Sequence, residues 1–230
     1  MPAEIIILSA GAVKPGLTQV IDAFRRESNY EVRVSFATAP AILKKIGGGE
    51  SVDILIAPPA VLDELGKLEK VAAESRAALG RIGIGVFVRD GAQLPQIATV
   101  DEFNQALLGA ESVVYNQAST GTYLEALFDR LGIGAALQAK ATRYPDFGAV
   151  LQHVSQGKGR EIGFGATTVI IENRDKGVQF AGPLPVEIQN YTAYAAAVIA
   201  QGDAKKAAQQ FMRFLSSPAA RSLLSAAGIQ

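Results

Sequence analysis

The chain has 230 residues, of which 49% are hydrophobic and 19% charged, and its 22 basic side chains equal its 22 acidic ones. This length suffices for one large domain or two smaller lobes, and the balanced charge excludes a general attraction to nucleic acid or to an acidic membrane surface. With no cysteine and His153 as the only histidine, disulfides, thiol nucleophiles and the usual zinc sites are excluded.

Strands and helices alternate in the first part of the chain. Apolar patterns predict strands at residues 5–8, 31–36 and 53–57, and helices at residues 16–27, 40–47 and 60–68. This βαβαβα order predicts a parallel sheet with helices on both faces. Ligands bind such sheets at the carboxyl ends of the strands, which here carry small residues at 9–12, 37–40 and 57–59.

A second lobe is predicted after a strand at residues 81–88, whose glycines at 83 and 85 suit a strand that passes from one sheet toward another. Its predicted helices lie at 100–108, 123–131 and 147–156, and its strands at 112–115, 139–143 and 161–166. A segment at 179–185 and a strand at 192–199 lead back to helices at 205–215 and 218–227. We therefore expect a two-lobed α/β fold: residues 1–83 with 194–230, and an inserted lobe at 84–193.

The segment from Asn116 to Tyr123 joins a strand to a helix through small, hydroxyl-bearing residues. The first N–H groups of a helix lack intrahelical partners and carry partial positive charge, so this segment is a candidate anion cradle. The alternative is that Ser119 or Thr120 merely caps the helix. Gly132 is expected to end it.

Ordered short motifs over nearly the whole chain resemble those of the molybdate-binding branch of the type II periplasmic solute-binding proteins. They lie at residues 9–12, 36–39, 49–57, 118–123, 157–164 and 211–218. The resemblance implies two hinged lobes that close over a ligand and a possible role beside an ABC permease. It also implies which residues line the cleft: Ala10, Gly11, Ala12, Thr38, Ala39, Ser119, Thr120, Gly121, Tyr123 and the turn at 166–168, including Thr167.

Three positions depart from that family's molybdate sites. Ala12 and the Thr38-Ala39-Pro40 loop stand where serines are expected, and Ala166 stands in place of a tyrosine. A buried charged oxygen without a donor costs about 1–3 kcal/mol. We therefore predict a larger organic carboxylate as the ligand, with molybdate or tungstate as an alternative. Because an aconitate isomerase is known on this scaffold, a cofactor-free isomerase of an unsaturated tricarboxylic acid is a second alternative.

Charged and phenolic side chains supply further candidates. Arg143 could hold a carboxylate through its guanidinium fork, with Lys14 and Arg160 as other cations. Tyr115 and Tyr123 flank the cradle and could donate hydrogen bonds. The alternatives are solvent-exposed charges and phenols that only pack.

Three further polar side chains could have either a catalytic or a structural role. Glu187 could act as a base in the isomerase alternative, and the alternatives that outweigh this role are a latch of the closed form and a plain surface position. His153 lies at the flank of its helix's apolar face, as a neutral surface histidine would, and Asp53 is expected to satisfy backbone N–H groups.

The expected partners follow from these predictions. We expect a small anionic ligand, no cofactor, no metal, no nucleic acid, no membrane insertion and a monomer. No apolar leader precedes the first strand, so the expected location is cytoplasmic if Met1 is the native start and periplasmic if a signal peptide was removed.

Overall fold

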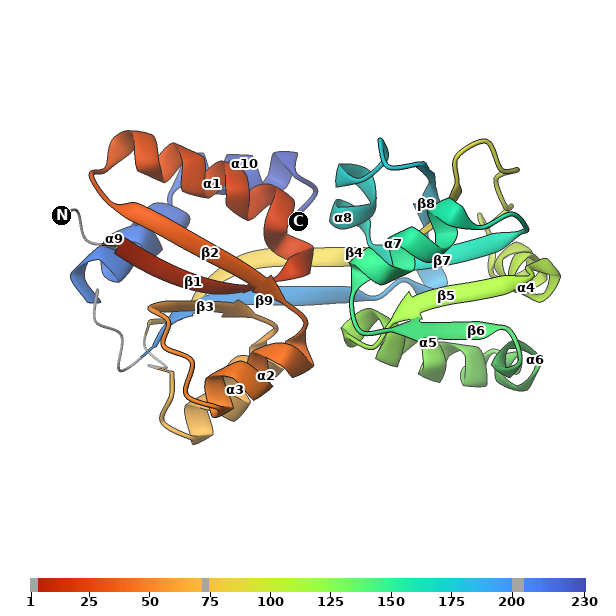
Figure 1. Ribbon diagram of the computed structural model, residues 1–230, viewed down its shortest axis with the longest axis horizontal. Helices are drawn as coiled ribbons and strands as arrows, with labels where there is room; N and C mark the ends of the chain where they lie inside the picture. Colours follow the sequence, from red (N-terminus) through yellow and green to blue (C-terminus); the bar gives the residue numbers. More distant parts are fainter. Residues whose placement is uncertain (1–3, 72–74, 200–204) are drawn as a thin grey trace. The chain divides into compact units, whose positions relative to one another are not determined.

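The computed structural model describes residues 4–71, 75–199 and 205–230. The chain divides into two compact units: unit 1 comprises Met1–Ile82 and Thr192–Gln230, and unit 2 comprises Gly83–Tyr191. The long strand β4 (Ala77–Arg89) leads from unit 1 into unit 2, and β9 (Tyr191–Val198) leads back (Figure 1).

Unit 1 contains a four-stranded arrangement in the order β2-β1-β3-β9. β2 and β3 run parallel to β1, which confirms the predicted parallel βαβαβα arrangement, and β9 runs antiparallel to β3. The remaining elements of the unit are β1 (Glu4–Ala10), η1 (Gly11–Val13), α1 (Lys14–Glu27), β2 (Glu31–Ala37), α2 (Ala39–Gly47), β3 (Ile54–Ala57), α3 (Pro59–Lys67), α9 (Lys205–Leu215) and α10 (Pro218–Ala226).

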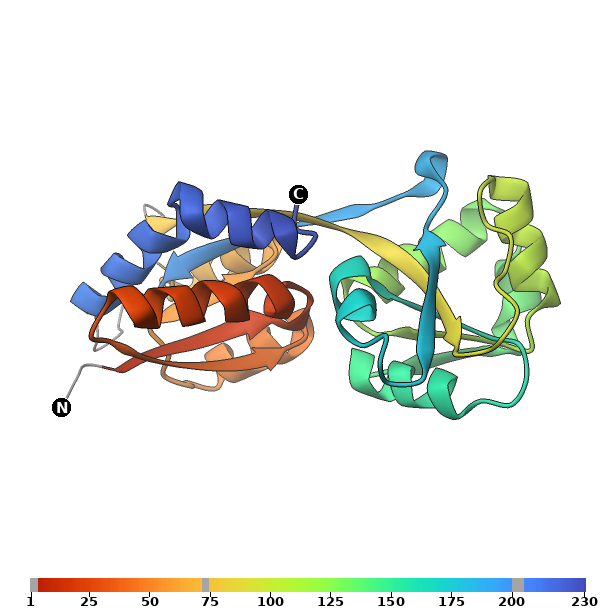
Figure 2. The ribbon, with the colours of Figure 1, turned by 90° about the horizontal axis from the view of Figure 1, so that it is seen from above.

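Helices cover both faces of the unit 1 sheet. Figure 1 shows α1, α9 and α10 on one face and α2 and α3 on the other, and Figure 2 shows α1 and α10 side by side. α1 buries Leu17, Val20, Ile21 and Phe24, which recur at helical spacing. The Phe24 ring packs edge-on against Phe211 of α9, with 5.1 Å between the ring centroids. The last helices therefore complete the core begun by the first strands.

Unit 2 contains strands in the order β4-β7-β5-β6, with β8 paired to the other edge of β4. β5 runs parallel to β6 and β7, whereas β4 runs antiparallel to β7 and β8. Its further elements are α4 (Val100–Gly109), β5 (Ser112–Asn116), α5 (Ser119–Arg130), α6 (Gly134–Gln138), β6 (Ala141–Tyr144), α7 (Phe147–Gln156), β7 (Glu161–Ala166), α8 (Thr167–Glu172), β8 (Val178–Pro183) and η3 (Val186–Ile188).

Two apolar cores lie on opposite faces of the unit 2 sheet. One contains Phe103 of α4, Leu124 and Phe128 of α5, and Phe164 of β7. The other contains Val150 and Val154 of α7, packed with Phe87 and Ile170. The side chains of β5 alternate between them: Val113 and Tyr115 belong to the first, Val114 to the second. The carboxyl end of β5 is thus fixed from both sides.

None of the helices in the described part of the chain is both long and apolar enough to cross a membrane. The longest of them, α1, has 14 residues and a charged outer face that includes Arg25 and Arg26.

Candidate functional site

The candidate anion cradle lies where β5 ends and α5 begins. α5 starts at Ser119, four residues earlier than the periodicity predicted, because its first turn consists of small residues without an apolar stripe. The N-cap is Ala118, whose side chain makes no cap hydrogen bond to the first turn of the helix, so the alternative that Ser119 or Thr120 caps the helix is wrong. In the described part of the chain, α5 thus begins without a side-chain cap, and its first N–H groups lie outside the intrahelical hydrogen-bond pattern.

Two close contacts hold this loop rigidly. The buried Asn116 side chain accepts a hydrogen bond from the Ala118 N–H at 3.0 Å. Gly121 lies so close to the strand end that a Cβ atom added to it would be 1.7 Å from the Asn116 carbonyl oxygen. Only glycine permits this approach. Thr120 is buried and Ser119 half-buried, so a hydroxyl group lies at the start of the helix on a fixed backbone.

The neighbouring strand β7 also leads directly into a helix. Ala166 is the N-cap of α8 without a side-chain cap bond, and the predicted turn at 166–168 is in fact the start of this short helix. Thr167, its first residue, is half-buried, while Thr168 is buried. β5 and β7 are parallel neighbours, so both helices begin at the same edge of the unit 2 sheet.

The predicted site residues of unit 1 lie at the carboxyl ends of the strands of its own sheet. Ala10 ends β1 and precedes η1, and a Cβ at Gly11 would meet no atom within 4 Å. Thr38 is the N-cap of α2 through its backbone, whose carbonyl accepts from Ile42 N–H at 2.9 Å, and no side-chain cap bond forms. Ala12, Thr38 and Ala39 are half-buried. Because β1 and β2 are parallel neighbours, the structure gathers these five residues at one sheet edge.

Arg143 and Tyr123 have protein partners. Arg143 lies opposite Tyr115 in the β5–β6 register, and its Nη1 is 2.7 Å from Glu125 Oε1 of α5. The Tyr123 hydroxyl donates to the Ile188 carbonyl at 2.8 Å and thereby fastens η3 to α5. Glu125 was not predicted from the sequence, since nothing in its spacing from Arg143 indicates their contact.

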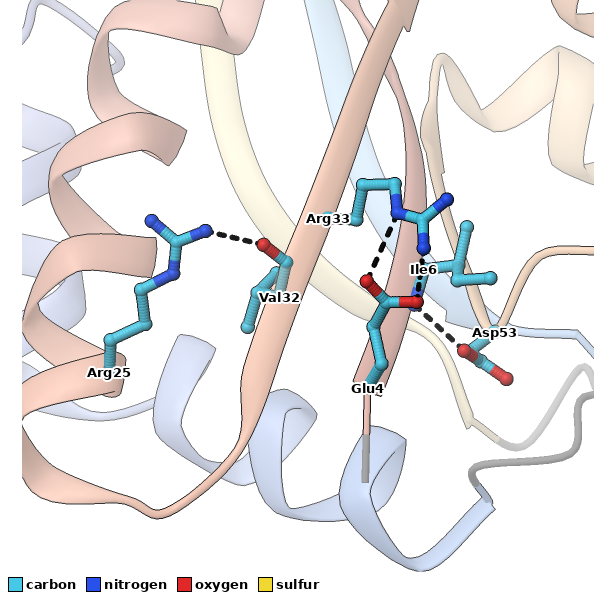
Figure 3. Close-up of polar contacts among 6 residues, drawn as sticks. All are labelled: Glu4, Ile6, Arg25, Val32, Arg33 and Asp53. Carbon is cyan, nitrogen blue, oxygen red and sulfur yellow. Dashed lines mark hydrogen bonds and ion pairs between the residues drawn. The ribbon is translucent and has the colours of Figure 1, made fainter. Parts of the chain in front are cut away.

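Three of the remaining candidates are exposed charged side chains. Glu187 is exposed in η3, Lys14 is exposed at the first position of α1, and Arg160 forms an exposed ion pair with Glu111 at 3.6 Å. His153 is half-buried rather than a surface residue: its Nδ1 lies 2.9 Å from the Tyr144 hydroxyl, and its Nε2 3.4 Å from Ser112 Oγ. The Asp53 side chain accepts the Ile6 N–H at 2.8 Å, which confirms its predicted structural role; Figure 3 shows this contact.

Comparison with known proteins agrees with this architecture. The family model of the bacterial extracellular solute-binding proteins matches residues 5–230. The chain belongs to this family. Among its relatives, an aconitate isomerase from a Pseudomonas species is 28% identical over 98% of this chain and 87% of its own length.

Solved structures resemble this solute-binding protein throughout its length. The periplasmic molybdate-binding protein of Azotobacter vinelandii has a TM-score of 0.82 and 18% identity, covering 98% of both chains. The sulfate-binding protein of Mycobacterium tuberculosis has a TM-score of 0.76 and 17% identity, covering 98% of this chain and 86% of its own. These likenesses show the two-lobed fold of type II periplasmic binding proteins, as predicted.

The chemistry available to this solute-binding protein at the start of α5 is anion recognition. Backbone N–H groups and hydroxyls are hydrogen-bond donors, and helix N-termini favour negative charge. In the described ranges, no group of three or more histidine, cysteine, aspartate or glutamate side chains could hold a metal ion.

Proposed function

We propose that this solute-binding protein binds a small organic carboxylate at the start of α5. The observation that carries the proposal is the uncapped helix start, held against the end of β5 by Asn116 and Gly121. Its first N–H groups are directed along the helix axis toward the N-terminal end, and the Ser119 and Thr120 hydroxyls can add donors. A rigid set of donors binds an anion without first having to be ordered.

Three alanines support a carboxylate rather than a compact tetrahedral oxyanion. Ala12 lies in η1, Ala39 begins α2 and Ala166 is the N-cap of α8, and the family resemblance implies hydroxyl-bearing residues at these places in a molybdate binder. A planar carboxylate needs fewer donors, and the methyl groups leave room for an organic skeleton. The relative that matches 98% of this chain is named for an unsaturated tricarboxylic acid, which points to the same ligand class.

The binding test is titration calorimetry with di- and tricarboxylates, and with molybdate, tungstate and sulfate as competing ligand classes. Removing a hydrogen bond to a charged group costs about 1.5–3 kcal/mol, so Ser119→Ala should weaken carboxylate binding about tenfold or more. Ser155→Ala is the matched control, because Ser155 also lies in a helix of unit 2 and its hydroxyl bonds only the Gln152 carbonyl. Binding of molybdate with no binding of any carboxylate would overturn the proposal.

The contribution of unit 1 to ligand binding is tested by a separate variant, at Thr38. The family resemblance implies that Thr38 contributes to recognition of the ligand, and the Thr38 hydroxyl makes no cap bond to α2. Thr38→Val keeps the shape of the side chain and removes the hydroxyl. A loss of carboxylate affinity in this variant would support that prediction, and an unchanged affinity would restrict recognition to other residues.

A second candidate is isomerisation of an unsaturated tricarboxylic acid, which the aconitate isomerase relative favours. The reaction would move a proton between carbons of the bound acid, and Glu187 is the base suggested by the sequence. Nuclear magnetic resonance in heavy water would detect deuterium entering the acid. Deuterium uptake that disappears in Glu187→Gln supports this candidate, and no uptake at saturating acid leaves binding alone.

A further inference from the structure

Unit 2 contains a cavity that is separate from the start of α5. It has a volume of about 590 Å³ and is bounded by α5, α6 and the strands β5 and β6. Ser119, Thr120 and Thr167 do not line it. A volume of this size accommodates a small organic molecule.

One wall of the cavity carries a buried phenol with a poor hydrogen bond. Tyr115 is only 3% exposed, and its hydroxyl lies 3.5 Å from Glu125 Oε1. Hydrogen bonds between oxygen atoms are usually 2.5–3.0 Å long, roughly half an ångström shorter. Burial raises the pKa of Tyr115, and the nearby Glu125 carboxylate raises it further. The phenol is therefore a neutral donor that lines the cavity and whose bond to Glu125 is long enough to be replaced by a bond to a better acceptor.

Charges of both signs lie around this phenol. Glu125 and Asp129 are four residues apart on α5, where two carboxylates repel each other. Arg143 pairs with Glu125 through Nη1, and a guanidinium has five N–H donors in all. A Cβ at Gly134 would lie 2.2 Å from Asp129 Oδ1, so the glycine at the start of α6 allows the Asp129 carboxylate to occupy the cavity wall.

We propose that this cavity binds a small zwitterionic α-amino acid. Its carboxylate would bind the Arg143 guanidinium and the Tyr115 hydroxyl, and its ammonium would bind Asp129 and Glu125, which relieves their repulsion. Its side chain would pack on Ala135 and Ala141, which belong to the apolar part of the lining. Neither a simple amine nor a simple carboxylate complements both charged walls.

Titration calorimetry on the full chain tests the proposal with a set of α-amino acids. The comparison compounds are the same skeletons without the carboxylate and without the amine. We expect at least one α-amino acid to bind, and both reduced compounds to bind at least about tenfold more weakly. If no α-amino acid binds, or if the amine alone binds equally well, the proposal is wrong.

Variants locate the binding within the cavity. Asp129→Asn and Tyr115→Phe each change only a polar group, and each should weaken amino-acid binding several-fold or more. Glu111→Gln is the matched control, because it removes the carboxylate of another exposed arginine pair of unit 2, outside this cavity. Affinity unchanged in both cavity variants would overturn the assignment.

The two proposed sites are distinguished by one further variant. Ser119→Ala should weaken binding of an organic carboxylate but leave amino-acid binding unchanged, since Ser119 does not line the cavity. Competition between the amino acid and the carboxylate would show that both occupy one site, and would overturn the second site while leaving the first proposal intact.

Discussion

At the scale of single residues, Asp53 shows how a buried charge can serve the fold. The residue is 5% exposed, and its side chain accepts the Ile6 N–H (Figure 3). Its own N–H donates to the Ile6 carbonyl at 2.8 Å. Asp53→Ala leaves the Ile6 N–H unpaired, which should lower the free energy of unfolding in urea by about 1–3 kcal/mol. Asp53→Asn retains an oxygen acceptor and should lose less. Equal stability of wild type and Asp53→Ala would contradict this role.

Because the pKa of Tyr115 is raised in the folded chain, we expect this residue to make the free energy of unfolding depend on pH, and we expect Tyr115→Phe to remove that contribution. Burial, and next the Glu125 carboxylate, raise the pKa of its phenol in the folded chain. Above about pH 10 the unfolded chain releases this proton first, so stability falls as pH rises through the folded-state pKa. Below that range the contribution is fully present. Tyr115→Phe should therefore show a shallower loss of unfolding free energy than wild type in urea titrations at high pH, and identical slopes would contradict the assignment.

At the scale of elements, the position of the first turn of α5 depends on Gly121, which has no side chain. Gly121→Ala would place a methyl group against the Asn116 carbonyl, so α5 would have to move away from β5. Such overpacking costs about 1–3 kcal/mol, and the displaced N–H groups should also bind the organic carboxylate more weakly. Gly109→Ala in α4 is the control, because a Cβ there meets no atom within 4 Å. Thermal denaturation and calorimetry of the two variants measure both effects.

Helices with a continuous apolar stripe were predictable from the sequence, and the shortest helices were not. α7 begins and ends where predicted, because its apolar stripe is continuous and Asp146 caps its first turn by accepting the Ala149 N–H at 3.0 Å. α6 and α8, with five and six residues, are too short to show a helical period and were missed. The Arg143–Glu125 contact was missed for a different reason, since it depends on the register between β5 and β6.

At the scale of the whole molecule, unit 1 is assembled from two distant parts of the chain. Ile229 is 2% exposed, and its side chain lies against Gly16 of α1 and Gly80 of β4. Gln230 extends this contact by pairing with Arg81: its carbonyl accepts from the Arg81 N–H at 2.7 Å, and its N–H donates to the Arg81 carbonyl at 3.0 Å. The segment after residue 192 therefore has to dock before the core of unit 1 is complete.

This dependence predicts how the molecule unfolds. Ile229→Ala should destabilise by about 2–5 kcal/mol, as for other buried large-to-small changes. In hydrogen exchange with mass spectrometry at low denaturant, protection should fall in both chain segments of unit 1 together, and far less in Gly83–Tyr191. Ile162→Ala, in the first core of unit 2, should give the reverse pattern. Equal loss of protection in both units from either variant would show that the chain unfolds as one cooperative unit.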